Sequence, residues 1–404
     1  MGTSPGRAPR GVAIIGATGS IGKAALDVIA RSPEQLAAVA LASGSSWEEL
    51  CRLARASGAQ AIALADPAAA ARAREELAGT GVTVLAGAEG VLAIAVWPGA
   101  AVTLAAPTGL AGLDPVLAAL AAGRDVALAN KESLVAGGRL VTRLARERGA
   151  RLLPVDSEHA ALFQCLHGRH AEAVRHLWLT ASGGPFRDWP QQALERATPA
   201  QALRHPTWRM GPRVTVDSAT LVNKGLEVIE AAWLFGVAPE AVRVLVHPQS
   251  IVHALVEYVD GTWLAQCAPA DMRLPIAHAL AHPDILATPQ VPPLDLAALG
   301  HLDFEPPDRD RFPCLDLAYA AAAAGQGAPA ALNAADEVAV TRFLHGEISF
   351  GDIPRLLASV LERHAPVDDG RLEGILEADA AARRLAGGWR PTVPLAASGK
   401  GTAP

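Results

Sequence analysis

Two acidic residues stand where a short apolar stretch gives way to a helix-like segment. In LLPVDSEHAAL, residues 152–162, the run Leu152–Val155 has the composition of a buried strand and is followed by Asp156, Ser157 and Glu158. In an extended segment, Asp156 and Glu158 are two residues apart and point to the same side. The alternative is that Asp156 caps the following helix and the other polar groups are solvated.

A second acidic group lies further along the chain, in VDSATLVNKGLEVIEAAWLF. There Asn223, Glu227 and Glu230 fall at i, i+4 and i+7, which places them on one helix face. Two ionised acids about 4 Å apart repel by roughly 1 to 4 kcal/mol, so acids gathered in a cleft need a compensating cation. All-oxygen ligands suit Mg²⁺ or Mn²⁺ better than zinc. Spacing alone does not bring Glu227 to Asp156, because that step depends on the fold.

A glycine-rich turn near the start of the chain is typical of phosphate binding. VAIIGATGSIGKAALDVIA places Gly16, Gly19 and Gly22 between an expected strand and an expected helix, with Thr18 and Ser20 as hydroxyl donors. The first glycine permits a tight turn, the second lets backbone N–H groups approach a phosphate, and the third lets the helix pack on the strand. The spacing departs from the commoner G-x-G-x-x-G. Its place in the first βαβ unit still favours a dinucleotide site.

The end of the second expected strand bears on the choice of dinucleotide. The strand AAVALAS ends at Ser43, Gly44, Ser45 and Ser46, where an NAD-binding fold usually offers an acid to the ribose 2′-hydroxyl. Without that acid, nothing repels a 2′-phosphate, so the sequence favours NADP. The nearest basic residue in sequence is Arg52.

Further polar clusters supply donors for a phosphorylated ligand. Ser182 opens an S-G-G turn after a strand, which is a good anion nest as well as an ordinary turn. RHPTWRMG, residues 204–211, reads either as a mobile lid or as a surface loop with a packed tryptophan. NKES, residues 130–133, follows a strand end, where open α/β sheets bind ligands.

Composition excludes several classes of function. Half of the 404 residues are apolar, 19% are charged, 4% are aromatic, and the net charge is −6 without a basic stripe. These values predict a large core and argue against nucleic-acid binding. The four cysteines form no Cys-x-x-Cys pair or disulfide framework, and we find neither a secretory signal nor a membrane span. We therefore expect a cytoplasmic protein with no nucleic-acid or membrane partner.

The chain divides into segments of different pattern. The fold class is α/β: an N-terminal Rossmann-like parallel-sheet domain, a central α/β catalytic domain and a C-terminal helical domain. Strand–helix alternation spans the first of these, and a proline-rich arm joins the second to the third. The expected boundaries are 1–150, 151–285, an arm at 286–312, 313–386 and a disordered tail at 387–404.

Several long motifs occur in a characteristic order. They are GATGSIG, LANKESLV, PVDSEHAALFQCL, LTASGGPF, HPTWRMG, VDSATLVNKGLEVIEA, VHPQSIVHALVEYVDG, DMRLPIAHAL and LNAADE. In these motifs, over about residues 12–385, the chain closely resembles the 1-deoxy-D-xylulose 5-phosphate reductoisomerases. The resemblance implies a homodimer that binds NADPH in domain 1–150, and a metal and a phosphorylated ketose in domain 151–285. It also implies retro-aldol and aldol rearrangement of 1-deoxy-D-xylulose 5-phosphate, then NADPH reduction to 2-C-methyl-D-erythritol 4-phosphate.

The resemblance also assigns residues to roles. The divalent cation, Mg²⁺, Mn²⁺ or Co²⁺, is expected on Asp156, Glu158 and Glu227. The expected catalytic residues are these three with Lys131 and His205. The expected substrate contacts are Ser157, Ser182, His205, Trp208, Met210, Ser218, Asn223, Lys224 and Glu227, with Trp208 and Met210 in the closing loop. The expected NADPH contacts are Thr18, Gly19, Ser20, Ile21, Gly44, Ser45, Ser46, Asn130, Lys131, Glu132 and Gly211.

Three departures from the family pattern stand out. Ser45 occupies a position where some members carry lysine, which bears on 2′-phosphate binding. Ala106, Pro107 and Thr108 replace the usual Gly-Ala-Ala of a cofactor loop. Asp336 stands where asparagine is usual, away from the expected metal ligands.

Two other functions were weighed against this interpretation. A semialdehyde-type NADP-dependent dehydrogenase needs a cysteine nucleophile, and none of the four cysteines has suitable surroundings in the sequence. A non-catalytic NADP-sensing module would need the glycine turn, but not the acids, the donor clusters or the lid.

Overall fold

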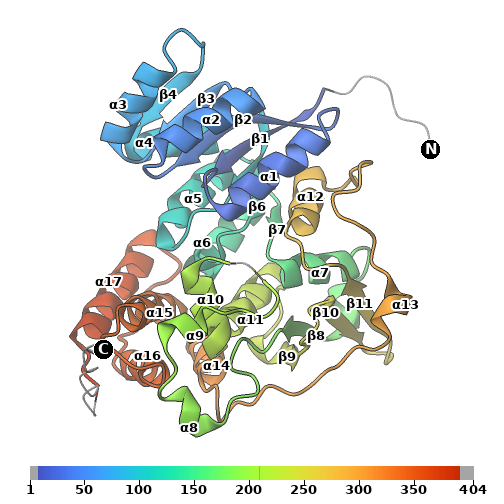
Figure 1. The fold of residues 1–404 in the computed structure, drawn as a ribbon, viewed down its shortest axis with the longest axis vertical. Coiled ribbons are helices and arrows are strands. Elements are labelled where there is room, and N and C mark those ends of the chain that lie inside the picture. Colours follow the sequence, from blue (N-terminus) through green and yellow to red (C-terminus); the bar gives the residue numbers. More distant parts are fainter. Residues whose placement is uncertain (1–7, 209, 392–404) are drawn as a thin grey trace, which may run out of the picture.

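The computed structural model describes residues 8–208 and 210–391. It has the expected α/β architecture, with two sheets and a group of C-terminal helices (Figure 1). A seven-stranded sheet forms the N-terminal domain, and a four-stranded sheet lies below it. The C-terminal helices pack beside the second sheet and against the helix α6 (Lys131–Arg148) of the first domain.

The first sheet is entirely parallel and has the order β4-β3-β2-β1-β5-β6-β7. Its strands are β1 (Arg10–Ile15), β2 (Leu36–Ser43), β3 (Ala61–Leu64), β4 (Thr83–Ala86), β5 (Ala100–Ala105), β6 (Asp125–Leu128) and β7 (Leu152–Pro154). Strand β7 pairs with β6, so this sheet continues past residue 150. Apolar runs that are buried on both faces suit its inner strands, because helices cover a parallel sheet on both sides.

Helices alternate with these strands. They are α1 (Ser20–Arg31), α2 (Trp47–Ser57), α3 (Pro67–Glu76), α4 (Gly87–Ala95), the 3₁₀ turn η1 (Leu110–Gly112), α5 (Leu113–Ala121) and α6. The chain runs outward from β1 to β4 and then returns to β5, on the other side of β1. This reversal opens a crevice at the carboxyl ends of β1 and β5, where such folds bind their ligands.

The glycine turn lies at this crevice. Gly16 has a φ of +85°, and a side chain there would meet the carbonyl oxygen of Ala106 at 2.5 Å. A Cβ on Gly22 would meet the carbonyl oxygen of Gly16 at 2.4 Å, so α1 can approach β1 only with glycine at this position. The turn therefore has the two properties expected of a phosphate-binding glycine loop: a positive φ and a close helix.

The second sheet has the order β11-β10-β8-β9, in which β8 and β9 are parallel and the other pairs antiparallel. Its strands are β8 (Val174–Ala181), β9 (Val242–Val246), β10 (Val252–Tyr258) and β11 (Trp263–Cys267). One face carries Leu177 and Leu179 and is buried against helices, including α7 (Ser157–Cys165) and α11 (Val222–Phe235). The opposite face carries His176, Trp178 and Glu257, which are only partly covered.

Helix α10 (Pro212–Thr220) leads directly into α11. Leu221 separates the two helices with a φ of +61°, which a residue with a side chain rarely adopts. The remaining short elements of this region are η2 (Ala171–Ala173), α8 (Gln191–Leu194), α9 (Pro199–Ala202) and η3 (Pro239–Ala241).

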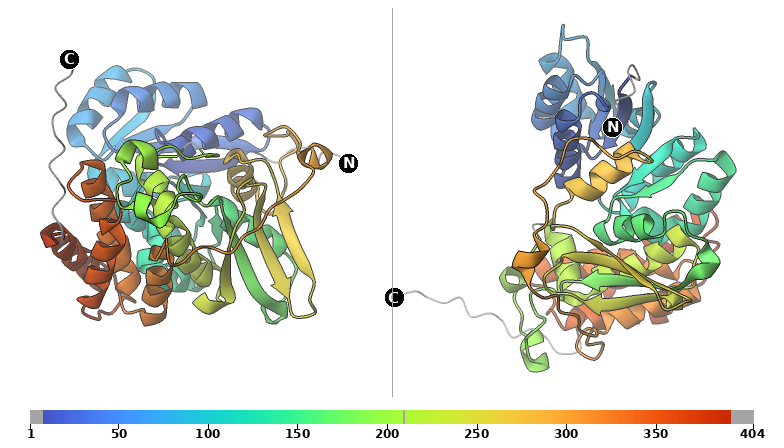
Figure 2. Two further views of the ribbon diagram at one scale, coloured as in Figure 1. Left: turned by 60° about the horizontal axis from the view of Figure 1, so that its bottom comes forward. Right: turned by 90° about the vertical axis from the view of Figure 1, so that its right-hand side faces the viewer.

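A proline-rich arm connects the second sheet to the C-terminal helices. It follows α12 (Arg273–Ala281), which packs against α1 and α7 between the two sheets (Figure 2), and it contains α13 (Leu296–Leu299). The C-terminal helices are α14 (Cys314–Ala324), α15 (Ala328–Leu344), α16 (Asp352–Glu362) and α17 (Leu372–Gly388). Among the helices of residues 8–208 and 210–391, none combines the length and apolarity needed to cross a membrane.

The disordered tail was expected to begin at residue 387, but ordered structure continues beyond that residue. Helix α17 continues to Gly388, and Trp389 packs against the C-terminal core while its carbonyl oxygen accepts a hydrogen bond from Arg342 at 3.1 Å. Apolar burial therefore orders the first part of the segment 387–404. Residues 392–404 lie outside the described residues.

Candidate active site

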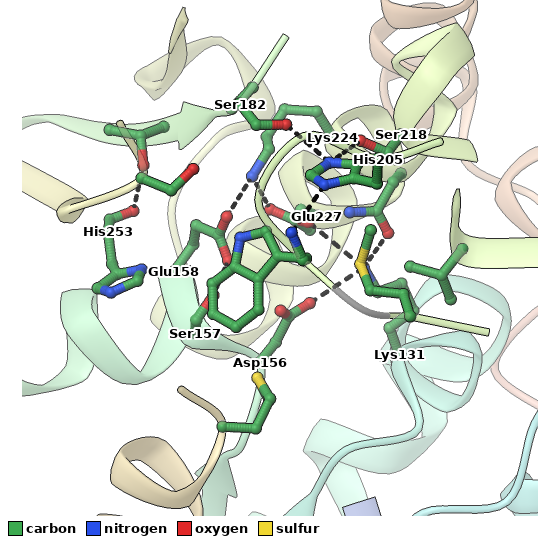
Figure 3. Close-up of a pocket in the computed structure, with 18 of the residues that line it drawn as sticks. Lys131, Asp156, Ser157, Glu158, Ser182, His205, Ser218, Lys224, Glu227 and His253 are labelled. Carbon is green, nitrogen blue, oxygen red and sulfur yellow. Dashed lines mark hydrogen bonds and ion pairs between the residues drawn. The ribbon is translucent and has the colours of Figure 1, made fainter. Parts of the chain in front are cut away.

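A cavity of about 360 Å³ lies between the carboxyl edge of the first sheet and the helices α10 and α11. It collects residues from distant parts of the chain. The expected site residues that line it are Ser20, Ile21, Lys131, Asp156, Ser157, Glu158, Ser182, His205, Trp208, Met210, Gly211, Ser218, Asn223, Lys224 and Glu227. Most of the residues proposed from sequence for substrate and metal binding therefore share one cavity (Figure 3).

The three expected metal ligands come from two helices. Asp156 occupies the N-cap position of α7, but its side chain makes no capping hydrogen bond, and Glu158 lies in the first turn of that helix. Glu227 projects from α11 and is 1% exposed. One ligand atom each from Asp156, Glu227 and His159 can be chosen so that all three lie within 4.8 Å of one another. The fold therefore supplies the approach of Glu227 to Asp156 that spacing alone left open.

Two lysines interleave with these acids. The ammonium group of Lys131 lies 3.0 Å from Asp156 Oδ2 and 3.4 Å from Glu227 Oε1. Lys224 donates to Glu158 Oε1 at 2.8 Å and also to Glu227 Oε2. Lys224 thus connects Glu158 to Glu227, and Figure 3 shows both lysines pointing into the group of acids.

The charge of this group fits one divalent cation. With Glu230, which is also buried, four carboxylates face two ammonium groups, so the fully ionised cluster has a formal charge of −2. Burial and the neighbouring Glu158 raise the pKa of Glu227 to about 7, and burial also raises the pKa of Glu230 to about 7. A hard divalent ion, which prefers oxygen ligands, would supply the missing positive charge.

His159 belongs to this site and was not identified from the sequence. Its Nε2 lies 2.9 Å from the backbone carbonyl oxygen of Glu227, so Nε2 carries the proton and donates. Its buried Nδ1 has no hydrogen-bond partner and faces Asp156 Oδ2 at 3.8 Å and Glu230 Oε2 at 3.9 Å. The signal in the sequence was its place three residues after Asp156, on the same side of α7.

The opposite end of the cavity is a trio of neutral donors. His205 Nε2 lies 2.9 Å from Ser182 Oγ and 3.1 Å from Ser218 Oγ. His205 Nδ1 accepts from the backbone N–H of Trp208 at 2.9 Å, so the imidazole proton resides on Nε2. Burial lowers the pKa of His205, which favours this neutral form. Three neighbouring groups that can each donate a hydrogen bond suit the oxygens of a phosphate.

The described residues of the expected lid, 204–208 and 210–211, are called the lid segment here and lie between α9 and α10, where the backbone N–H of Trp208 donates to His205 of the trio. Trp208 and Met210 line the cavity, and the Trp208 ring centroid lies 6.1 Å from that of His253. Asn223 and Lys224 start α11 at the floor of the cavity, where Asn223 Oδ1 accepts from Lys131. Trp208 and Met210 of the lid segment thus line the same cavity as the phosphate-type donors and the acids.

The residues proposed for cofactor binding fall into three groups. Ser20 and Ile21 reach the cavity from the start of α1, while a hydrogen bond of 2.6 Å joins the Thr18 hydroxyl in the glycine turn to the Ser43 hydroxyl at the end of β2. Gly44, Ser45 and Ser46 are exposed at the end of β2 and the start of α2.

Asn130 and Glu132 lie behind the cavity wall. Asn130 Nδ2 donates to the carbonyl oxygens of Pro107 and Gly109, and Asn130 Oδ1 accepts from Ser133 N at 3.1 Å. Both carboxylate oxygens of Glu132 likewise accept hydrogen bonds from other groups of the protein. These two side chains hold the scaffold, whereas Lys131 between them reaches the cavity.

Comparison with known proteins identifies the family. Three sequence profiles match: 1-deoxy-D-xylulose 5-phosphate reductoisomerase over residues 12–138, the C-terminal domain of the same enzyme over 152–235, and the DXP reductoisomerase C-terminal domain over 267–385. The 1-deoxy-D-xylulose 5-phosphate reductoisomerase of Synechococcus sp. (strain JA-2-3B'a(2-13)) is 50% identical over 377 residues, or 92% of this chain and 95% of that protein. The enzyme of Symbiobacterium thermophilum is 51% identical over 381 residues, 93% of this chain and 98% of its own length.

Solved structures of this enzyme have the same fold. The Zymomonas mobilis enzyme in complex with NADPH superimposes with a TM-score of 0.88 at 43% identity, covering 94% of this chain and 98% of the other. A DOX-P reductoisomerase in complex with NADPH, fosmidomycin and magnesium gives a TM-score of 0.89 at 41% identity, covering 94% and 97%. From the profiles, the identities and the shared fold, it follows that this chain belongs to the 1-deoxy-D-xylulose 5-phosphate reductoisomerase family.

Proposed function

We propose that this chain rearranges 1-deoxy-D-xylulose 5-phosphate and reduces the product with NADPH to 2-C-methyl-D-erythritol 4-phosphate. This reaction belongs to the methylerythritol phosphate route to isoprenoid precursors. The single observation that carries the proposal is the polarity of the cavity. A group of acids whose fully ionised form lacks two positive charges lies at one end, the neutral trio Ser182, His205 and Ser218 lies at the other, and the glycine turn reaches the cavity at Ser20.

We assign the divalent cation, Mg²⁺, Mn²⁺ or Co²⁺, to Asp156, Glu158 and Glu227. The close approach of Asp156 and Glu227, the formal charge of −2 and the raised pKa of Glu227 support this assignment, and Lys224 joins Glu158 to the same cluster. His159 Nδ1 is an additional nearby donor. A cation bound here supplies Lewis-acid polarisation of a ketone and its neighbouring hydroxyl, while NADPH supplies the hydride.

The phosphate of the substrate is assigned to Ser182, His205 and Ser218, with Ser157, Asn223 and Lys224 nearer the reacting carbons. A phosphate held at the remote end provides binding energy that orients the reacting end. Trp208 and Met210 of the lid segment exclude water when a ligand fills the cavity. The geometry of His205, with Nε2 as donor, supports this direction of binding.

Lys131 acts through its charge in this proposal. Burial alone would lower its pKa, but Asp156 and Glu227 outweigh burial and raise it above its ordinary value. The ammonium group therefore stays protonated, which favours electrostatic stabilisation beside the reacting atoms over proton abstraction.

NADPH is assigned to the crevice beside β1. Thr18, Gly19, Ser20 and Ile21 supply the pyrophosphate loop, and Gly44, Ser45 and Ser46 the region of the 2′-phosphate, where no acid opposes a second negative charge. Lys131 and Gly211 approach the nicotinamide from the cavity, since both line it. Asn130 and Glu132 serve the cofactor through the segment 107–109 that they hold.

The chemistry of the cysteines does not favour a semialdehyde-type dehydrogenase. Cys51, Cys165, Cys267 and Cys314 all lie in the described part of the chain, and none of them lines the cavity. Burial, with a smaller contribution from Cys267, raises the pKa of Cys165 to about 11, which disfavours a thiolate.

The deciding experiment is NADPH oxidation with 1-deoxy-D-xylulose 5-phosphate, measured by absorbance with and without EDTA. We expect oxidation that EDTA stops and Mg²⁺ or Mn²⁺ restores. Oxidation that persists in EDTA, or NADPH binding without turnover of any ketose phosphate, would argue against the proposal.

A homodimer in the cytoplasm completes the proposal. The half-exposed Trp263 on the edge strand β11, next to the partly covered face of the second sheet, supports association with a second copy. The four unpaired cysteines support a reducing compartment.

A further inference from the structure

A buried cluster of charged residues outside the cavity surrounds Arg213, near the start of α10. Arg213 Nη1 donates to Glu132 Oε1 at 2.7 Å and to Glu337 Oε1 at 2.9 Å. Arg213 Nη2 donates to Asn333 Oδ1 at 2.8 Å, and Nε lies 3.6 Å from Asp217 Oδ2. One guanidinium group therefore joins α6, α10 and α15.

Glu132 connects this cluster to the cofactor side. Its Oε1 also accepts from the backbone N–H of Gly109 at 2.9 Å, and its Oε2 accepts from Asn130 Nδ2 at 2.8 Å. The segment 106–109 that it holds touches the glycine turn, because Ala106 N donates to Ile15 O and the Ala106 carbonyl lies directly against Gly16. A shift of Glu132 is thus transmitted to the backbone beside the expected dinucleotide.

Arg213 connects the same cluster to the substrate side. It lies two residues after the lid segment ends at Gly211, and Ser218 lines the cavity from the same helix, α10. Arg213 and Asp217, at i and i+4, share one face of α10, whereas Ser218 points to His205. The orientation of α10 about its axis therefore determines where Ser218 meets a phosphate.

Helix α15 provides a fixed support for this connection. Glu337 Oε2 accepts from Arg383 Nη2 at 2.6 Å, and Arg383 is held in turn by Asp379 on α17. Asn333 is fully buried. The α15 side of the cluster is therefore held by contacts to a second helix, α17, in addition to those with Arg213.

We propose that the Glu132–Arg213 pair is a positioning device that couples NADPH binding to binding at the phosphate end of the cavity. The inference rests on the proposed function. In this proposal, bound NADPH orders the segment 106–109 and thereby holds the side chain of Glu132 in place. Glu132 in turn holds Arg213, which orients α10 so that Ser218 is placed to bind the second ligand. By thermodynamic linkage, the second ligand must tighten NADPH by the same factor.

The test measures the NADPH dissociation constant by fluorescence, with and without saturating fosmidomycin in Mg²⁺ buffer. The ratio of the two constants is the coupling. We compare two variants. Glu132→Gln keeps the shape of the side chain and removes its charge, whereas Arg213→Lys keeps the charge and loses the planar guanidinium group that bonds several partners. The control is Arg342→Lys, a mostly buried arginine that binds Glu347 and the carbonyl oxygens of Ala386 and Trp389, away from the cavity.

We expect Glu132→Gln to reduce the coupling ratio at least 5-fold, Arg213→Lys to reduce it less, and Arg342→Lys to leave it within 2-fold of the wild type. Circular dichroism checks the fold of each variant. If Arg213→Lys does not fold, the coupling ratio of Glu132→Gln alone tests the proposal. If Glu132→Gln does not fold, a reduction of the coupling ratio by more than 2-fold in Arg213→Lys supports the proposal.

Three results would overturn the inference. They are a wild-type protein that binds both ligands without coupling, variants that keep the wild-type ratio, and variants that weaken NADPH equally with and without fosmidomycin. A wild-type protein that binds neither ligand would instead overturn the proposed function, and this inference with it.

Discussion

The ammonium group of Lys131 lies 3.0 Å from Asp156 Oδ2, although the two residues are 25 positions apart in the chain. They meet because Lys131 begins the helix after β6 and Asp156 follows β7, and these two strands are parallel neighbours. The carboxyl ends of parallel neighbours share one edge of a sheet. The acids and the lysines meet at this edge of the sheet. Removing one of their charges should therefore change both metal binding and stability.

Glu227→Gln should abolish metal-dependent NADPH oxidation while leaving the protein folded. The amide removes a ligand charge, but it also relieves the repulsion from Glu158 that helps raise the pKa of Glu227. Thermal unfolding without metal should therefore be unchanged or higher, and Mn²⁺ binding measured by calorimetry should fall at least 100-fold. Glu373→Gln, on the exposed side of α17, serves as the control. Retained Mn²⁺ affinity would contradict the ligand assignment.

His205→Ala should weaken the binding of the phosphate. Removing one hydrogen bond to a charged group costs about 1.5 to 3 kcal/mol, so kcat/KM should fall about 10- to 100-fold, mainly through a higher KM for the ketose phosphate. The dissociation constant for NADPH alone should stay within 2-fold. His364→Ala, which removes a histidine that contacts the Gln326 carbonyl, is the matched control. A fall in kcat with unchanged KM would assign His205 to the chemical step instead.

Asp336→Asn should stabilise the protein at neutral and alkaline pH. Burial raises the pKa of Asp336 to about 6, despite the opposing effect of Arg213. The folded state therefore binds its proton more tightly than the unfolded state, and stability falls as pH rises from about 4 to about 6. The difference from the ordinary value of 3.8 corresponds to about 3 kcal/mol above that window. Unfolding temperatures at pH 4 and pH 8 should show a gain only at pH 8.

Asp125→Asn should have the opposite effect on stability at pH 8. Burial would raise the pKa of Asp125, but the hydrogen bonds from Arg151 outweigh it and hold the pKa below its ordinary value. This carboxylate contributes stability that is present above its unfolded pKa and is lost as pH falls. Asp125→Asn should therefore destabilise the protein at pH 8. Destabilisation by both substitutions at pH 8 would contradict the assignment for Asp336, and stabilisation by both would contradict the assignment for Asp125.

Trp263→Glu should dissociate the proposed homodimer. Trp263 is 45% exposed on the edge strand β11, and a charge there would be buried in an interface with a second copy. Light scattering after size-exclusion chromatography should show half the mass of the wild type. Leu376→Glu, at an exposed apolar position of α17, should leave the mass unchanged. A wild-type monomer, or a dimeric Trp263 variant, would exclude this surface.

The fold was predictable from the sequence because its signals are local. Apolar runs of strand length, the glycine turn and the proline-rich arm all indicate their own structure. The family resemblance supplied the set of site residues. The boundaries were less predictable, since β7 joins the first sheet only through pairing with β6, and α17 continues to Gly388, next to the partly buried Trp389 that packs against the C-terminal core.

The detailed geometry of the site depended on contacts between distant segments. Asp156 and Glu158 were expected to share an extended segment, but α7 already begins at Ser157, so they reach the cavity from a helix N-terminus. Nothing in NKES indicates that Lys131 enters the cavity while Glu132 turns away to Arg213. His159 was not predicted as a site residue, because its hydrogen-bond partner is a backbone carbonyl 68 residues further along the chain. Such contacts are set by packing and leave no local pattern.

The positive φ of Leu221 has a consequence for the size of ligand that can react. The break at Leu221 turns the chain so that Ser218 faces one end of the cavity while Asn223 and Glu227 face the other. In the proposed function, this short backbone segment therefore sets the distance between the phosphate of the substrate and its reacting carbons. Lengthening that segment by a single residue would change the orientation of α11 relative to α10, and a sugar phosphate of the original length would no longer span the two ends.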